Sequence, residues 1–206
     1  MSDSARVILA SGSWNRRRIL ASLGVRFTVI PSNVDERKVR ESDPVEKAKK
    51  IARLKARAVA PKQEGVIIAA DTFGVLGDIE LQKPKNLADA RRMLRLMSGK
   101  RVKMVTGVCV IDTRNGTEST SSRIAYVSCK KLSDDEIERY VKTRPVTKWA
   151  AASNPVDKAS AAIFAPVGRY AYGMDRFSLP IDVVVRALAR AGIQVNQTKL
   201  KKLSYR

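Results

Sequence analysis

Residues 6–24 read RVILASGSWNRRRILASLG and encode a strand, a turn and a helix. The apolar run Arg6–Ala10 is typical of a buried strand, and the small residues Ser11–Ser13 form a turn. Ser13 can accept a hydrogen bond from the first backbone N–H groups of the helix that follows, and the last glycine of the stretch suits the end of that helix. A helix that directly follows a strand is typical of an α/β fold.

The same alternation continues along the chain. Further strands are expected at residues 26–30, 66–70, 102–111 and 123–128. Further helices are expected after the capping residues Asp43, Asn86 and Ser133, and over residues 182–191. Residues 143–179 show no clear period. The interleaving predicts an α/β fold with a mixed twisted sheet flanked by helices, one domain over residues 1–192 and a basic tail over residues 193–206.

The composition restricts the chemistry. The 206 residues include 40 Lys and Arg but only 20 Asp and Glu, and the formal charge of +20 favours anionic partners such as nucleotides, nucleic acid or acidic lipid. The absence of histidine excludes a Ser-His-Asp triad, a Cys-His pair and a HExxH zinc site. The only cysteines, Cys109 and Cys129, form neither a disulfide framework nor a CxxC pair. Without a membrane-length apolar run or a signal-peptide pattern, we expect a cytoplasmic protein with no membrane partner.

The turn before the first helix is a candidate phosphate site. Arg16 and Arg17 lie in the first helical turn, where the positive end of the helix dipole disfavours cations. A bound phosphate would resolve this conflict, because it accepts hydrogen bonds from guanidinium groups and from free backbone N–H groups. The alternative is a solvated basic helix face, and the spacing alone does not separate the two interpretations.

Lys55 interrupts the apolar stripe of the second helix, four residues after Ile51 and four before Val59. It either extends along the edge of the stripe into solvent or points into a functional cleft. In the second case, Lys55→Met should make the stripe continuous and raise stability slightly while activity is lost.

Acidic residues complete the candidate site. Asp71 directly follows the apolar run 66–70, so we expect it at the carboxyl end of a buried strand, where ligands of α/β proteins collect. There it can hold a divalent metal or activate water, or alternatively cap the next turn. Thr72 adds a hydroxyl, Lys83 adds a cation before a proline, and Glu36 adds a second carboxylate in a loop.

Together these pieces resemble the Maf family of septum-formation-inhibitor-like nucleoside triphosphate pyrophosphatases. The resemblance runs from about Val7 to Gly107, with a weaker return near Asp157 and near Leu179-Pro180. The matching motifs, in order, are Ala10–Ser13 with Arg16-Arg17, Val34–Glu36, Ala52 with Lys55-Ala56, Ala70–Thr72, Lys83-Pro84, Ala90 with Met93-Leu94, Ser98–Lys100 and Thr106-Gly107. Their order and spacing make the resemblance specific.

The resemblance implies an inosine-triphosphatase-like fold with a cleft between two lobes, and hydrolysis of a nucleoside triphosphate, standard or modified, to the monophosphate and pyrophosphate. It implies Asp71 as general base, with Lys83 and Glu36 also catalytic, and a divalent cation, Mg²⁺ or Mn²⁺, held by Asp71 and Glu36. The implied substrate-binding residues are Ser11, Ser13, Asn15, Arg16, Arg17, Lys55 and Thr72, of which Asn15 and Thr72 would discriminate between nucleobases. It also suggests a homodimer.

The chain departs from the family pattern at several positions. Trp14-Asn15 replaces the usual Pro-Arg, and Val102 replaces a histidine. The later Asp-Lys-Ala-Gly-Ala-Tyr block corresponds best to Asp157–Ala162, or in a rival alignment to Thr147–Trp149. The glutamine that normally follows this block has no clear counterpart, so activity is better supported than substrate choice.

The alternative function is nucleic-acid binding by a Maf-like scaffold with weak catalytic power. The charge of +20 and the basic tail motivate it, but aromatic residues are only 5% of the chain and no RNA-binding or helix-turn-helix signature is present. Release of pyrophosphate from nucleoside triphosphates separates the two hypotheses.

Overall fold

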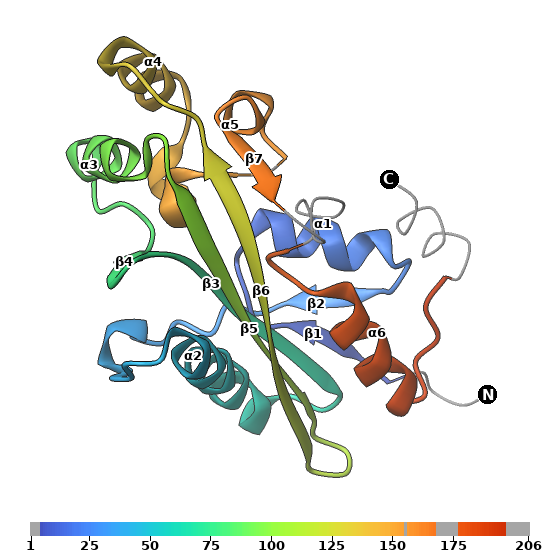
Figure 1. The fold of residues 1–206 in the computed structure, drawn as a ribbon. Coiled ribbons are helices and arrows are strands. Elements are labelled where there is room, and N and C mark those ends of the chain that lie inside the picture. Colours follow the sequence, from blue (N-terminus) through green and yellow to red (C-terminus); the bar gives the residue numbers. More distant parts are fainter. Residues whose placement is uncertain (1–4, 155, 168–176, 197–206) are drawn as a thin grey trace. The chain divides into compact units, whose positions relative to one another are not determined.

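A computed structural model describes residues 5–154, 156–167 and 177–196 (Figure 1). Its helices are α1 (Trp14–Ser22), α2 (Pro44–Val59), α3 (Leu87–Met97), α4 (Asp134–Thr143), α5 (Lys158–Ala161) and α6 (Ile181–Arg190). Its strands are β1 (Val7–Leu9), β2 (Phe27–Val29), β3 (Val66–Leu76), β4 (Ile79–Leu81), β5 (Arg101–Asp112), β6 (Thr117–Cys129) and β7 (Phe164–Val167). Short 3₁₀ turns are η1 (Glu36–Lys38), η2 (Ala60–Lys62), η3 (Val146–Lys148) and η4 (Ala150–Ala152).

The strands form a mixed sheet in the order β2-β1-β3-β5-β6-β7, and β4 pairs with β3. β1 runs parallel to both β2 and β3, with Leu9 opposite Val29 on one side and opposite Ile68 on the other. β7 pairs antiparallel with β6. The predicted class, an α/β fold with a mixed sheet flanked by helices, is therefore confirmed.

The chain divides into two compact units. The first unit contains the described residues of 5–71, 106–123 and 177–196, and the second unit contains those of 72–105, 124–154 and 156–167. β3, β5 and β6 contribute residues to both units. The predicted cleft, and the boundary between a domain over 1–192 and a tail over 193–206, stay predictions; residues 197–206 of that tail lie outside the described residues.

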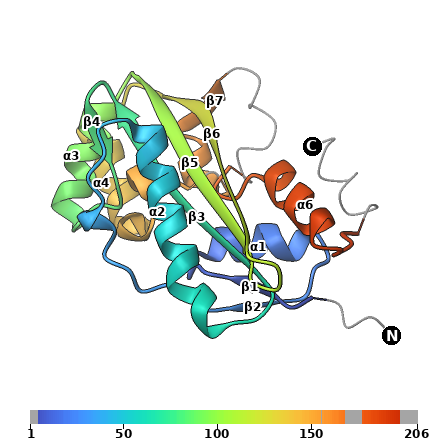
Figure 2. The same cartoon turned by 90° about the horizontal axis from the view of Figure 1, so that it is seen from below.

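In the first unit, helices cover both faces of the sheet (Figure 2). α1 and α6 pack on the face that carries Leu9 and Ile68. α2 packs on the opposite face, which carries Ile8 and Ile67. Neighbouring strand residues point to opposite faces, so a strand covered on both sides is apolar at every position. This explains the uninterrupted runs 7–10 and 66–70 in the sequence.

Gly107 sets how closely α2 approaches the sheet. A Cβ atom at this position would lie 2.2 Å from the backbone oxygen of Ala48, so only glycine fits. The close approach fixes α2 against β5, and Lys55 lies seven residues, or about two turns, further along the same helix. A single small residue of β5 thus positions the helix that carries the lysine.

In the second unit, α3 and α4 are joined by ion pairs of Arg91 with Glu138 and of Arg95 with Asp134. The segment without a sequence period contains η3, η4, α5 and β7, and it includes Ala151 and Ala152 with positive φ angles of 51° and 52°. The Ala151 N–H donates to the Gln82 carbonyl oxygen at 3.0 Å. Short 3₁₀ turns and left-handed alanines have no period of 2 or 3.6, and α5 and β7, with 4 residues each, are too short to show one. The sequence pattern therefore predicts no element there.

Two predicted strand boundaries are wrong. β3 does not end at Asp71 but continues to Leu76, because the segment after Asp71 pairs with β4. β6 begins at Thr117 rather than at residue 123, since its polar first half lies half-buried in the sheet. In both cases a polar residue stands inside a strand, which an apolar pattern does not reveal. Within the described ranges, none of the helices is long and apolar enough to cross a membrane.

Candidate active site

A buried arginine, Arg16, lies at the start of α1 and contacts the turn that connects β1 to α1. Ser13 caps α1, and its Oγ accepts from the Arg16 N–H at 3.5 Å. The Ser11 Oγ accepts from Arg16 Nη1 at 3.0 Å, and the backbone oxygen of Ser178 accepts from Arg16 Nε at 2.9 Å. Only 8% of Arg16 is exposed. The guanidinium is therefore fixed beside the N-terminal end of its own helix.

The charge of Arg16 lies in the field of two carboxylates. Burial lowers the pKa of Arg16, and the charges of Asp71 and Glu36 act in the opposite direction and raise it. An arginine remains protonated at neutral pH despite such shifts, so the site keeps this positive charge.

Lys55 joins the same two carboxylates directly. Its Nζ atom lies 2.7 Å from Asp71 Oδ1 and 2.8 Å from Glu36 Oε1. The side chains of Lys55 and Asp71 are 8% and 7% exposed, while that of Glu36 is 43% exposed. Lys55 thus points inward at an acidic pair, and the interpretation in which it extends along the helix edge into solvent is wrong.

Local capping places Lys55 and Glu36. The Asp43 carboxylate accepts from the N–H groups of Val45 and Glu46 at 2.8 Å and starts α2, the helix of Lys55. Asp35 caps η1 and accepts a hydrogen bond from the Arg37 side chain. This hydrogen bond holds the pKa of the Asp35 carboxyl below its usual value. Asp35 therefore forms the turn, and the neighbouring Glu36 contacts Lys55.

The second oxygen of Asp71 is open to a ligand. Among the described residues, Asp71 Oδ2 is buried and has no hydrogen-bond partner. A buried carboxylate oxygen left in this state is costly, and such atoms in native proteins are typically satisfied by water, an ion or a ligand. This atom is the part of the site that is best prepared to receive one.

A divalent metal fits this donor set. The described residues contain no cluster of three acidic or cysteine side chains that could hold a metal alone. Mg²⁺, however, is typically bound by one or two carboxylates together with substrate phosphates and water. Asp71 and Glu36 supply two such carboxylates with hard oxygen donors, which suits Mg²⁺ or Mn²⁺ that arrives with a phosphate ligand.

Hydrogen bonds join Ser11 and Ser13 to Arg16, ion pairs join Glu36 and Asp71 to Lys55, and the charges of the two carboxylates act on Arg16, all within the first unit. Asn15 is half-buried and Arg17 is exposed on α1. Thr72 and Lys83 belong to the second unit, so their part in the site stays a prediction.

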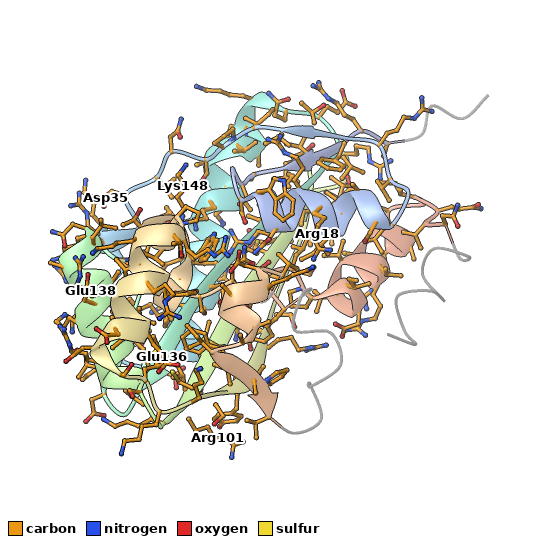
Figure 3. All side chains as sticks on the ribbon, turned by 90° about the horizontal axis from the view of Figure 1, so that it is seen from above. Arg18, Asp35, Arg101, Glu136, Glu138 and Lys148 are labelled. Atoms are coloured by element: carbon orange, nitrogen blue, oxygen red, sulfur yellow. The ribbon has the colours of Figure 1, made fainter. Side chains whose placement is uncertain are left out.

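Two contacts of this region were not predicted from the sequence. Ser178 holds Arg16 from 162 positions away, and no local pattern can reveal such a pairing. Trp14 is 62% exposed, and the Arg18 guanidinium (labelled in Figure 3) lies 5.9 Å from the centre of its ring. The spacing of four residues on a helix is a signal that could have predicted this second contact.

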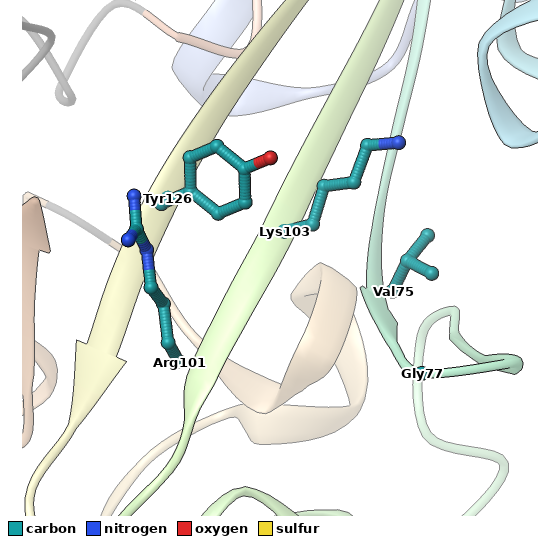
Figure 4. Close-up of a pocket in the computed structure, with 5 residues that line it drawn as sticks. All are labelled: Val75, Gly77, Arg101, Lys103 and Tyr126. Carbon is teal, nitrogen blue, oxygen red and sulfur yellow. The ribbon is translucent and has the colours of Figure 1, made fainter.

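The second unit contains a shallow basic pocket of about 380 Å³ (Figure 4). Val75, Gly77, Arg101, Lys103 and Tyr126 line it. The Arg101 guanidinium lies 4.1 Å from the centre of the Tyr126 ring, within the range of a cation–π contact. No carboxylate is among these lining residues, and none of them was predicted as a site residue.

Solved structures support the fold. The Ham1 protein of Staphylococcus aureus aligns with a TM-score of 0.53 over 90% of this chain and 98% of that chain, at 12% identity. A HAM1 protein from Coxiella burnetii gives the same TM-score over 90% and 99%, at 11% identity. At this level of identity the likeness concerns the fold alone, and it agrees with the predicted architecture.

Sequence relatives support the family. The dTTP/UTP pyrophosphatase of Desulforamulus reducens is 36% identical over 197 residues, which cover 92% of this chain and 98% of the relative. The protein of the same description from Pyrococcus furiosus is 44% identical over 142 residues, which cover 68% and 72%. The family described as Maf-like protein matches residues 6–171. With this match over most of its length, and with the acidic pair and lysine of its motifs in direct contact, the chain belongs to the Maf-like family.

Proposed function

We propose that this protein hydrolyses a nucleoside triphosphate to the monophosphate and pyrophosphate. Membership of the Maf-like family and relatives described as dTTP/UTP pyrophosphatases support this reaction. The observation that carries it in the structure is the buried Lys55 ammonium between Asp71 and Glu36, with Asp71 Oδ2 left open. The reaction needs a fixed carboxylate beside cations, and this arrangement provides both.

The phosphates would bind at the turn before α1. Backbone N–H groups at a helix N-terminus bind phosphate, and Arg16 adds a fixed guanidinium beside them. Ser11 and Ser13 supply hydroxyl groups in the same turn, and the exposed Arg17 can reach phosphates that extend into solvent. The role of this turn is to hold the charged end of the substrate.

Asp71 would act on the attacking water. In the free protein Lys55 holds Oδ1 at 2.7 Å and so fixes the orientation of the carboxylate before substrate binds. Oδ2 has no partner among the described residues and would accept a proton from the water that attacks the α-phosphorus. Because the chain has no histidine, a carboxylate is the natural general base. Arg16, Lys55 and Lys83 would stabilise negative charge on the phosphate oxygens.

Asp71 and Glu36 would hold Mg²⁺ or Mn²⁺. When bound, such an ion neutralises phosphate charge and polarises the bond that is cleaved. Of these two carboxylates, Glu36 is the more exposed, so it would be the ligand that solvent reaches more easily.

The base preference is proposed from the relatives, so dTTP and UTP are the first substrates to test. Asn15 and Thr72 stay the predicted base-discriminating residues, and the replacement of Pro-Arg by Trp14-Asn15 motivates a panel that also includes modified nucleotides. The homodimer and the nucleic-acid-binding alternative stay predictions.

The test is product analysis over a panel of standard and modified nucleoside triphosphates with Mg²⁺ or Mn²⁺. We expect equal amounts of monophosphate and pyrophosphate, with no diphosphate. Lys142→Met is a control for surface charge, since Lys142 lies exposed in the last turn of α4 in the second unit. Release of inorganic phosphate alone, or no turnover of any nucleotide by the folded protein, would overturn the proposal.

A further inference from the structure

Lys55 lies where a cation shared by the two carboxylates would lie. Its Nζ atom contacts one oxygen of Asp71 and one oxygen of Glu36 at nearly equal distances, 2.7 and 2.8 Å. The lysine comes from α2, and the two carboxylates come from β3 and η1. Three separate elements thus converge on one positive charge, which balances carboxylates that would otherwise repel each other.

The local charge count opposes a divalent cation in the free protein. Asp71 and Glu36 carry two negative charges, and Lys55 and Arg16 carry two positive charges within the same electrostatic cluster. A divalent cation added to this balanced cluster would leave two uncompensated positive charges in a largely buried place, which is strongly unfavourable. A nucleotide phosphate chain reverses this balance, because it brings several negative charges.

We infer that Lys55 is the resident counter-ion of the two carboxylates and transfers to a nucleotide phosphate when substrate binds, which opens the carboxylates to the divalent cation. This inference rests on the proposed function, since it requires a phosphate ligand at this site. Metal and nucleotide then bind as a coupled pair, and each raises the affinity of the other by the same factor. Lys55 is thus a positioning residue for the metal as well as a ligand for phosphate.

The coupling of metal and nucleotide binding follows because the buried Lys55 ammonium must keep an anionic partner. Lys55 is 8% exposed, so it leaves its carboxylates only when another anion receives it. A metal ion alone offers no such anion, whereas a phosphate does. The free protein should therefore bind Mn²⁺ weakly, and removal of the ammonium should make Mn²⁺ binding strong without any nucleotide.

The first experiment measures Mn²⁺ affinity by calorimetry or electron paramagnetic resonance in the absence of nucleotide. Lys55→Met should bind Mn²⁺ at least about tenfold more tightly than the wild type. Lys49→Met is the matched control, because it removes the same charge from the same helix. Lys49 pairs with Glu46 at 2.7 Å and does not contact Asp71 or Glu36 in the ion pairs given above. If Lys55→Met binds Mn²⁺ no more tightly than Lys49→Met, the counter-ion role is wrong.

The second experiment uses the wild-type protein and does not depend on how well the variant folds. The affinity for the non-hydrolysable α,β-methylene analogue of UTP is measured at several fixed free Mn²⁺ concentrations. We expect Mn²⁺ to raise it at least about tenfold in the wild type and in Lys49→Met. Independent binding of metal and analogue to the wild type would overturn the inference.

The two experiments separate this inference from the proposed function. A wild-type protein that releases pyrophosphate but shows no coupling and no Lys55 effect on Mn²⁺ retains the function and loses the counter-ion role. A protein that hydrolyses no nucleotide, but whose Lys55→Met variant binds Mn²⁺ tightly, loses the function and retains the competition between ammonium and metal.

Discussion

Two basic regions of this molecule treat their cations in opposite ways. In the first unit, Lys55 is 8% exposed and contacts two carboxylates. In the second unit, Arg101 is exposed and Lys103 is half-exposed, and they line a pocket without a carboxylate. The formal charge of +20 does not distinguish these cations. Their surroundings do, because burial and pairing decide whether a lysine belongs to a site or to a charged surface.

The difference is one of dielectric surroundings. Charges near water interact weakly and are screened by salt over about 8 Å at physiological ionic strength. Buried charges interact strongly, and each depends on its partner. Changes in the first region should therefore affect catalysis and stability, and changes in the second should affect only weak binding of polyanions.

The largest expected effect is on turnover. Asp71→Asn keeps the shape of the side chain and a carbonyl oxygen that can accept from Lys55, but removes the basic oxygen, so kcat should fall by roughly 10²–10⁴. Lys103→Met should leave kcat within about twofold. Steady-state kinetics on both folded variants test this. Near-normal turnover of Asp71→Asn would exclude Asp71 from the mechanism.

The second effect is on stability. Lys55→Met leaves Asp71 and Glu36 without their shared counter-ion and should lower the free energy of unfolding by about 3 kcal/mol. Lys103→Met should change it by less than about 0.5 kcal/mol. Urea unfolding without metal measures both values. A gain in stability for Lys55→Met would show that the apolar stripe outweighs the charge cluster.

This sign reversal shows what the sequence reveals and what it conceals. The stripe on α2 predicts a small gain for Lys55→Met, because methionine makes the stripe continuous. The carboxylates that reverse the sign come from β3 and η1, and no helical period reports them. A sequence pattern identifies the exceptional lysine, but its partners are set by tertiary packing.

Capping residues were the most predictable part of the fold. Ser13, Asp43, Asn86 and Ser133 each accept a backbone N–H at a helix start, as predicted. These signals are local, since a cap and its donors lie within three residues. The continuation of β3 past Asp71 and the contact of Arg16 with Ser178 are non-local, so they were not predicted.

The third effect is on polyanion binding. Arg101→Ala with Lys103→Ala removes both cations of the second unit's pocket and should weaken poly(dT) retention about tenfold at low salt. It should also reduce the salt slope of that binding by about two, because two phosphate contacts are lost. Nucleotide hydrolysis should change much less with salt. Unchanged retention would show that polyanions bind elsewhere on the basic surface.

The two cysteines report the two units separately. Cys109 lies in the first unit and Cys129 in the second, both are buried, and burial raises the pKa of each thiol to about 11. An exposed thiol has a pKa of about 8.5, so the thiol of an opened unit loses its proton at a lower pH than the thiol of the closed unit. The free energy of opening therefore has its full value below about pH 8.5 and decreases as the pH rises toward 11. Labelling by iodoacetamide should keep accelerating across this range, whereas a plateau near pH 8.5 would indicate exposed thiols.

The smallest expected effect is a difference between the labelling rates of these two thiols, which separates local from global opening. In a Cys129→Ser background, Lys55→Met should accelerate labelling of Cys109, because the lost counter-ion lies in the first unit. In a Cys109→Ser background, the same change should accelerate labelling of Cys129 less, by a margin of about fivefold at pH 8, if each unit opens by itself. Equal acceleration of both thiols would mean that β3, β5 and β6, which contribute to both units, make the opening a single cooperative event. The contrast between the two regions would then hold for their chemistry but not for their stability.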